Sequence, residues 1–175
     1  LQGTRFLGSA LTHVKQQAHT PEQQYVLSEL LIGLADLYAN LGKLEQVKDY
    51  LEQSLVLLAQ QPGTIRQHSY ALTSLGRLNW QLGNYPTAQK QLETALTYAR
   101  RLDDNRQSAN ILHGLAIIHK TQGQLEQAYS YYQDALESYK GAGETANIVM
   151  TMNNLAALLL VKGQTTKARK LLEEG

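Results

Sequence analysis

A glycine-centred pattern occurs four times in this chain and constrains its fold more than any other feature of the sequence. The glycines lie 41, 40 and 40 residues apart, at Gly42, Gly83, Gly123 and Gly163. A leucine and a small residue precede each glycine by seven to eight positions, at Leu34-Ala35, Leu75-Gly76, Leu115-Ala116 and Leu155-Ala156. A compact apolar residue follows five positions later, at Val47, Ala88, Ala128 and Ala168, and a large one nine positions later, at Leu51, Leu92, Tyr132 and Leu172. Four copies in one register indicate a repeat array.

Each copy is predicted to be two helices joined by a turn. Apolar residues step by three and four before the glycine, as at Leu31, Leu34 and Tyr38, and again after it, which is the spacing of one helix face. A glycine between them can adopt the left-handed conformation that ends a helix without a Cβ clash. We therefore expect helix boundaries at the four glycines and close helix crossings at small residues such as Ala128.

Capping signals mark where the first helices start. Thr20-Pro21-Glu22-Gln23 combines an N-cap threonine, a first-turn proline and a capping-box glutamine. Thr64 and Gln67 have the same spacing as the N-cap threonine and the capping-box glutamine. The predicted fold class is all-α, an α-solenoid of antiparallel helix pairs. It is one array over residues 1–175, made of a second helix of a partial repeat and four repeats, the last truncated in its second helix: 1–18, 20–60, 64–102, 104–140 and 144–175.

Composition excludes several functional classes. The chain has 43% hydrophobic and 18% charged residues with a net charge of +1 and no basic run, which argues for a folded protein and against a nucleic-acid partner. It has no cysteine, so disulfides and thiolate zinc sites are excluded and a reducing, cytoplasmic compartment is expected. Its apolar runs, such as "LAALLLV" at 155–161, are far shorter than the roughly 20 residues of a membrane span, so no membrane partner is expected.

Motifs for catalysis or cofactor binding are not supported by their context. "GAGETA" at 141–146 matches a dinucleotide fingerprint, but that motif must follow a strand, and here a helix precedes it. The five histidines form no closely spaced metal-binding pair. We therefore predict no enzyme activity, no catalytic residue, no metal and no cofactor.

The pattern resembles the tetratricopeptide repeat. The second copy matches that family at Leu72, Leu75, Gly76, Gly83, Tyr85, Ala88, Leu92 and Ala95, and the third at Leu112, Leu115, Ala116, Gly123, Leu125, Ala128, Tyr132 and Ala135. The repeat of about 40 residues is similar to the longer form found in kinesin light chains, Leu-Gly-Asn adaptors and bacterial signalling proteins. The family's tyrosine is replaced by Asn79 and His119. The resemblance implies a right-handed superhelix.

The resemblance also implies that exposed positions of each first helix line a concave groove for a protein or peptide. The expected binding residues are Tyr70, Thr73, Arg77, Trp80, Asn110, His113, Ile117, Lys120 and Asn153, and equivalent positions are Glu29, Ile32, Asp36 and Ala157. Two alternatives stay open. Trp80 either fills the core beside Asn79 or serves as an exposed anchor, and Tyr129 and Tyr131 either pack against the next unit or form a convex binding patch.

The expected function is therefore a protein or peptide interaction module, a sensor or scaffold fragment of a larger signalling protein. The alternative is the regulatory repeat arm of a signal-transduction ATPase or transcription regulator, controlling an attached catalytic or DNA-binding domain. The sequence that adjoins residues 1–175 would discriminate the two. The sequence at both ends resembles parts of repeats without a polar cap, so we expect the chain to be a fragment of a longer protein. Oligomerisation through the repeat ends is an alternative that stays open.

Overall fold

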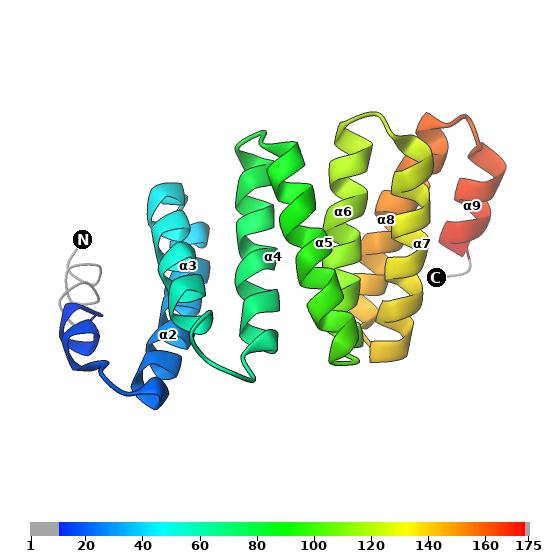
Figure 1. The fold of residues 1–175 in the computed structure, drawn as a ribbon. Helices are drawn as coiled ribbons and strands as arrows, with labels where there is room; N and C mark the ends of the chain where they lie inside the picture. Colours follow the sequence, from blue (N-terminus) through cyan, green and yellow to red (C-terminus); the bar gives the residue numbers. More distant parts are fainter. Residues whose placement is uncertain (1–10, 174–175) are drawn as a thin grey trace. The chain divides into compact units, whose positions relative to one another are not determined.

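All the regular secondary structure is helical in residues 11–173, the part of the chain that the computed structural model describes (Figure 1). Helical residues 11–17 come first. They are followed by α2 (Pro21–Asn40), α3 (Leu44–Leu58), α4 (Ile65–Gln81), α5 (Tyr85–Arg101), α6 (Asn105–Thr121), α7 (Leu125–Ala142), α8 (Thr145–Val161) and α9 (Thr165–Glu173). The all-α prediction is confirmed. The first ten residues of the helix predicted over 1–18 lie outside the described part.

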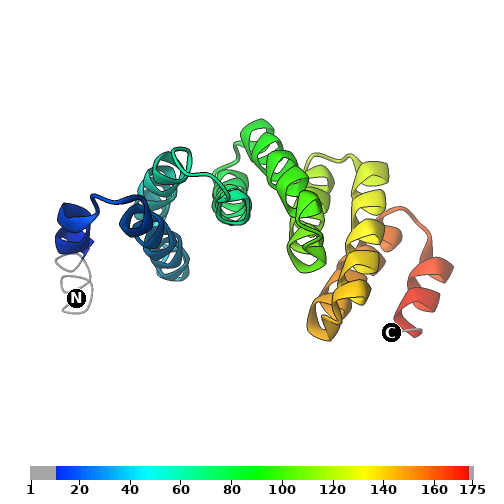
Figure 2. The ribbon, with the colours of Figure 1, turned by 60° about the horizontal axis from the view of Figure 1, so that its bottom comes forward.

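The chain divides into two compact units, Leu1–Ser74 and Leu75–Gly175, and their boundary lies inside α4. The first unit contains α2, α3 and most of α4. The second contains the end of α4 and all of α5 to α9. Within the second unit α7 packs against both α6 and α8, and α8 packs against α9, as Figures 1 and 2 show.

The four glycines form the predicted turns. Their φ angles are positive, at 69°, 78°, 74° and 72° for Gly42, Gly83, Gly123 and Gly163. At the third turn the Gly123 amide donates to the Lys120 carbonyl over 3.1 Å, and the Gln124 amide donates to the His119 carbonyl over 2.9 Å. These two hydrogen bonds satisfy carbonyls that the helix end leaves unpaired. Each first helix ends two residues before its glycine, so the predicted boundaries are confirmed.

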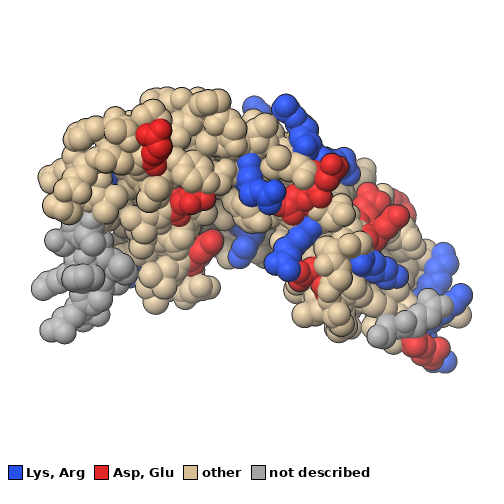
Figure 3. Space-filling model, turned by 90° about the horizontal axis from the view of Figure 1, so that it is seen from below, with Lys and Arg blue, Asp and Glu red and all other residues tan. Residues whose placement is uncertain are grey.

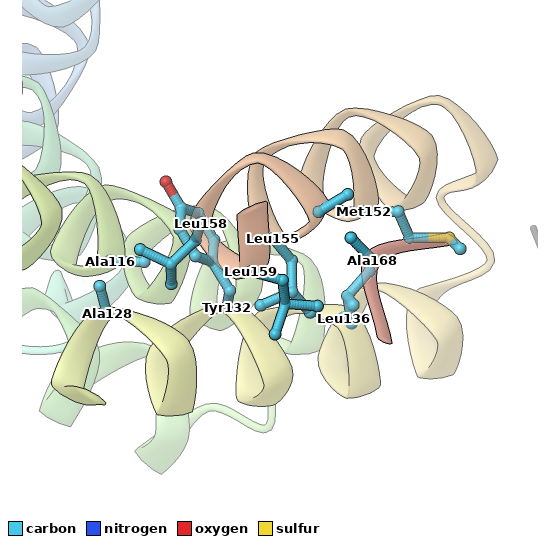
Figure 4. Close-up of a cluster of buried hydrophobic side chains, with 10 residues drawn as sticks. Ala116, Ala128, Tyr132, Leu136, Met152, Leu155, Leu158, Leu159 and Ala168 are labelled. Atoms are coloured by element: carbon cyan, nitrogen blue, oxygen red, sulfur yellow. The ribbon is translucent and has the colours of Figure 1, made fainter. Parts of the chain in front are cut away.

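Small residues line the crossing of each helix pair, as predicted. Val47, Ala88, Ala128 and Ala168 are all buried, with 0 to 3% of their surface exposed. A Cβ atom on Gly76 would lie 2.7 Å from Cγ of Leu92, so the end of α4 approaches α5 too closely for a side chain at that position. In the next pair, Ala116 and Ala128 occupy the corresponding place (Figure 4).

The core of the second unit joins four helices. Tyr132 and Leu136 of α7 belong to one buried cluster with Ala116 of α6, Leu155 and Leu159 of α8, and Ala168 of α9 (Figure 4). Leu172 stands at the register of Tyr132 but is 50% exposed, and no helix in the described part of the chain follows α9 and covers it.

Helix α2 starts at its predicted capping signal, whereas Gln67 of the second predicted signal makes hydrogen bonds to another helix. Thr20 and Gln23 form the predicted capping box at α2. Gln67 instead donates hydrogen bonds from its side chain to Glu29, over 3.2 Å, and to the Tyr25 hydroxyl. The Gln67 side chain therefore ties α4 to α2.

Candidate functional site

The predicted groove residues of the first unit differ in exposure. Tyr70 is 40% exposed and Thr73 only 9%. The Thr73 hydroxyl donates to the Ser69 carbonyl over 2.7 Å, so it satisfies its hydrogen bond within its own helix. Among the equivalent positions, Glu29 and Asp36 are exposed and Ile32 is half-buried. Thr73 therefore does not offer the exposed side chain that was expected there.

Trp80 stands near the end of α4 and is half-buried. Its indole N–H donates to the Thr121 hydroxyl at the end of α6 over 3.5 Å, a long hydrogen bond. Asn79 occupies the position of the family's tyrosine, and its amide donates to Gln91 of α5 over 2.9 Å. The Asn79 side chain occupies that position and bonds to α5, so Trp80 does not fill it. Trp80 lies against α6 instead, with part of its ring exposed.

His113 was expected on an open groove, but it is buried, with 7% exposed. Its ring nitrogens lie 2.9 Å from the Thr151 hydroxyl and 3.4 Å from Nδ2 of Asn154, both on α8. Its ring meets Tyr132 edge to face at 5.4 Å. Burial lowers the pKa of His113, and Lys120 lowers it further, so the imidazole is neutral near pH 7. His113 links α6 to α8.

Asn110 is exposed, but its amide oxygen accepts a hydrogen bond from the Tyr139 hydroxyl over 2.7 Å. Tyr139 belongs to α7, and burial together with Glu144 raises the pKa of its hydroxyl to about 12. The phenol therefore stays protonated at neutral pH and remains a donor. This bond holds Asn110 toward the second helix of its own pair.

Four of the remaining predicted residues lie on α4 and α6, which are joined nearby by the hydrogen bond from the Trp80 indole to Thr121. Arg77 and Trp80 lie three residues apart on α4, and Ile117 and Lys120 lie three apart on α6, so each pair shares a helix face. Arg77 is exposed, and the other three are half-buried. Ile117 packs against the buried cluster, and its carbonyl accepts the Thr121 hydroxyl that Trp80 contacts. We call Arg77, Trp80, Ile117 and Lys120 the Trp80 surface.

Helix α8 exposes Asn153 and Ala157, and also apolar residues that the sequence reasoning missed, Met150 and Leu160 among them. Met150 is 44% and Leu160 53% exposed. They stand 40 residues after Asn110 and Lys120, so applying the repeat spacing to the predicted residues would have found them.

Cavities of the second unit lie away from the predicted residues. One of about 640 Å³ lies between α5 and α7, with Tyr131 in its wall, and one of about 510 Å³ lies between α7 and α9, with Tyr129. The predicted binding residues line neither. Tyr131 stacks on His119 of its own helix pair at 5.1 Å, whereas the Tyr129 ring lies 5.1 Å from the Lys162 ammonium of the next pair. The expected packing against the next unit thus holds for Tyr129, while Tyr131 packs within its own pair.

The charged side chains do not indicate a separate binding site. Figure 3 shows Lys and Arg interspersed with Asp and Glu on one face, without a continuous basic stripe on that face. The described residues contain no group of three His, Cys, Asp or Glu side chains placed to hold a metal ion. Of the helices described, none is both long and apolar enough to cross a membrane.

Comparisons with known sequences find the same repeat. Family models described as tetratricopeptide repeat match residues 67–141 and 28–56. Protein KINESIN LIGHT CHAIN-RELATED 1 of Arabidopsis thaliana is 26% identical over 174 residues, covering 94% of this chain and 27% of that protein. KINESIN LIGHT CHAIN-RELATED 2 of the same plant is 24% identical over 148 residues, covering 82% and 22%. The chain thus spans about a quarter of the length of these curated relatives.

Solved structures share the fold. BtubC (BKLC) from P. vanneervenii superposes with a TM-score of 0.77 at 21% identity, covering 94% of this chain and 68% of that one. Aspartyl phosphate phosphatase F from Bacillus subtilis superposes with a TM-score of 0.81 at 14% identity, covering 85% and 39%. At these identities the likeness concerns the fold alone, an α-solenoid of helix pairs.

Proposed function

The chain belongs to the tetratricopeptide repeat family, and from that premise we propose that it binds a protein or peptide partner through the Trp80 surface. The repeats and the structural neighbours support a protein–protein interaction module. Stacked repeats of this kind offer extended concave binding surfaces. The proposal assigns partner binding to four residues, Arg77 and Trp80 of α4 and Ile117 and Lys120 of α6.

The observation that carries the proposal is a half-buried tryptophan on α4 whose indole donates a hydrogen bond to Thr121 at the end of α6. Arg77 precedes Trp80 by about one helical turn on α4, and Lys120 is the residue before Thr121 on α6. Tryptophan and arginine are the residues most enriched where binding energy concentrates. A ring that the fold already holds in place loses little freedom on binding. The two cations favour a partner with acidic residues. The proposed ligand is therefore an extended peptide or amphipathic helix that carries apolar and acidic side chains.

In this proposal the chain is a sensor or scaffold segment of a larger cytoplasmic signalling protein, and its role is binding without catalysis. The absence of cysteine agrees with that compartment. The alternative, a regulatory arm of an ATPase or transcription regulator, would use the same surface to control an attached domain.

A double substitution tests the Trp80 surface. Peptides are selected from a random display library on the immobilised chain, and their affinities are measured by calorimetry. Trp80→Ala with Arg77→Ala should weaken the selected peptides by roughly 30-fold or more, the effect of losing one anchor worth about 2 kcal/mol. Arg101→Ala, an exposed arginine on α5, is the matched control and should bind like the parent.

Circular dichroism should show the same helicity for the parent and the double variant, since Arg77 is exposed and Trp80 is only half-buried. Peptides that bind both forms equally well would place the site elsewhere. Loss of binding in the Arg101→Ala control alone would point to the cavity between α5 and α7, which Arg101 lines.

A further inference from the structure

Helices α5 and α7 leave a groove between them in the middle of the second unit. In the described part of the chain both pack against α6, but neither packs extensively against the other. Two cavities occupy the space, of about 640 and 480 Å³, and Arg100 lines both, so they adjoin. Their floor is one face of α6, at Ser108, Leu112 and Leu115, spaced by four and three residues. We call this the α5–α7 groove.

The wall on α5 supplies an apolar residue and two cations. Leu96 is buried at its base, and Arg100 and Arg101 are exposed about one turn later. Neither arginine forms an ion pair with a residue that the structure describes. Burial and the Glu93 carboxylate raise the pKa of the Tyr131 hydroxyl on the opposite wall, whereas Arg100 lowers it. The positive charge of Arg100 therefore acts across the groove.

The wall on α7 supplies an aromatic ring and two acids. Tyr131 is half-buried, and its ring stacks on His119 of α6 with 5.1 Å between the ring centroids, which holds it in place. Asp134 and Glu137 follow at steps of three residues. Both are exposed, and within the described chain neither carboxylate forms an ion pair. The groove is thus apolar at its Tyr131 end and acidic at its Glu137 end, with Arg100 between them.

We infer that the α5–α7 groove binds an amphipathic helix of a partner protein, with a bulky apolar side chain, an acidic residue one turn away and a basic residue one turn further. The apolar side chain enters the cavity beside Tyr131. The acid pairs with Arg100 and Arg101, and the base pairs with Asp134 and Glu137, because opposite charges across an interface select the partner. A helix suits the groove because its side chains recur about every 5.4 Å, one turn, as the groups of the walls do.

The groove is separate from the Trp80 surface. Leu115 of the groove floor and Ile117 of that surface stand two residues apart on α6. Two residues correspond to about 200° around a helix, so the two side chains lie on opposite faces of α6. A partner can therefore occupy either site without the other, and the inference does not depend on the proposed function. Arg101→Ala, the control for the Trp80 surface, removes a contact of the groove, so the variant that weakens a ligand identifies its site.

Two designed peptides test the inference. Each is stapled to hold a helix and carries phenylalanine, glutamate and lysine about one turn apart. The second peptide has these three in reverse order, because a helix can lie in the groove in either direction. Fluorescence anisotropy measures binding to the chain 1–175. At least one peptide should bind, and less tightly at high salt. If neither binds, the inference is wrong.

Substitutions in the groove should weaken the peptide that binds. Arg100→Ala with Arg101→Ala removes both cations and should weaken binding by about tenfold or more. Thr97→Trp, at an exposed position that lines the larger cavity, should fill the apolar end and weaken binding similarly. Lys140→Ala is the matched control, because Lys140 is exposed on α7 and lines neither cavity of the groove. It should bind like the parent.

Charge exchange is the decisive experiment. Arg100→Glu with Arg101→Glu should lose the peptide and should instead bind a form in which its glutamate is replaced by lysine. Recovery of binding also shows that this variant folds. Equal binding of the two peptide forms to the charge-reversed chain would overturn the inference. Unchanged binding to Arg77→Ala with Trp80→Ala is expected, and loss there would assign the peptide to the Trp80 surface and overturn the inference as well.

Discussion

Tyr132 shows how packing at one repeat position outweighs a lost hydrogen bond. Its ring is fully buried in the cluster of the second unit, and its hydroxyl has no hydrogen-bond partner among the described residues. Burial raises the pKa of that hydroxyl to about 12, so it stays neutral. An unpaired buried hydroxyl costs about 1–3 kcal/mol, but a buried aromatic ring of this size contributes a comparable or larger gain.

At the residue scale, the helix crossing at Ala128 gives a test of stability. Ala128 is fully buried beside Ala116 (Figure 4). Ala128→Leu should lower the free energy of unfolding by roughly 1–3 kcal/mol, because extra volume in a close-packed crossing forces the helices apart. Urea denaturation measures the change.

The control for this substitution is Ala146→Leu, at an exposed position of α8, and it should be close to neutral. If Ala128→Leu unfolds at the same urea concentration as the parent, the helices do not cross at this residue.

At the element scale, the turns decide where helices end. Four glycines with positive φ recur at one register, and in each turn the amide of the following residue bonds back to a carbonyl in the last turn of the first helix. Asp103 makes the same pattern at the end of α5 with φ of 51° and no glycine. Its short side chain tolerates this region better than most.

Two glycine substitutions should therefore change stability in opposite directions. Gly123→Ala places a Cβ atom in the left-handed region and should destabilise by about 1–2 kcal/mol. Gly33→Ala lies inside α2 with open space around it and should stabilise by about 0.5–1 kcal/mol, because alanine favours helix and loses less entropy on folding. Thermal unfolding of both variants measures the difference. Equal effects of the two would contradict a special conformation at Gly123.

At the scale of the whole molecule, stability should vary along the second unit. Helices α6 and α7 each pack against helices on two sides, whereas α9 packs against α8 alone among the pairs with extensive contact. In an array of repeats, protection follows the number of neighbours. Hydrogen exchange read by mass spectrometry should be slowest in α6 and α7 and fastest in α9.

The same chain unfolded in denaturant gives the unprotected baseline. Protection of α9 equal to that of α6 would contradict the gradient.

Part of the candidate site followed from the sequence, and part did not. The repeat register led to Arg77, Trp80, Ile117 and Lys120, and the hydrogen bond from Trp80 to Thr121 joins α4 to α6 beside them. The same register also selected Thr73 and His113, which are buried, because the sequence records the helix face of a residue but not which neighbour covers it. Their roles in binding remain predictions.

The sequence by itself determined the helices and their turns. A period of three and four residues defines a helix face, and glycine adopts a positive φ more readily than other residues, so both are local properties that a single segment reveals. Only the tertiary structure decided exposure. His113 is buried because α8 lies against α6, and Leu160 in the equivalent position of Lys120 is exposed because the described residues contain no further first helix after α8. Burial depends on the neighbouring element, and identical positions of a repeat therefore differ with their place in the array.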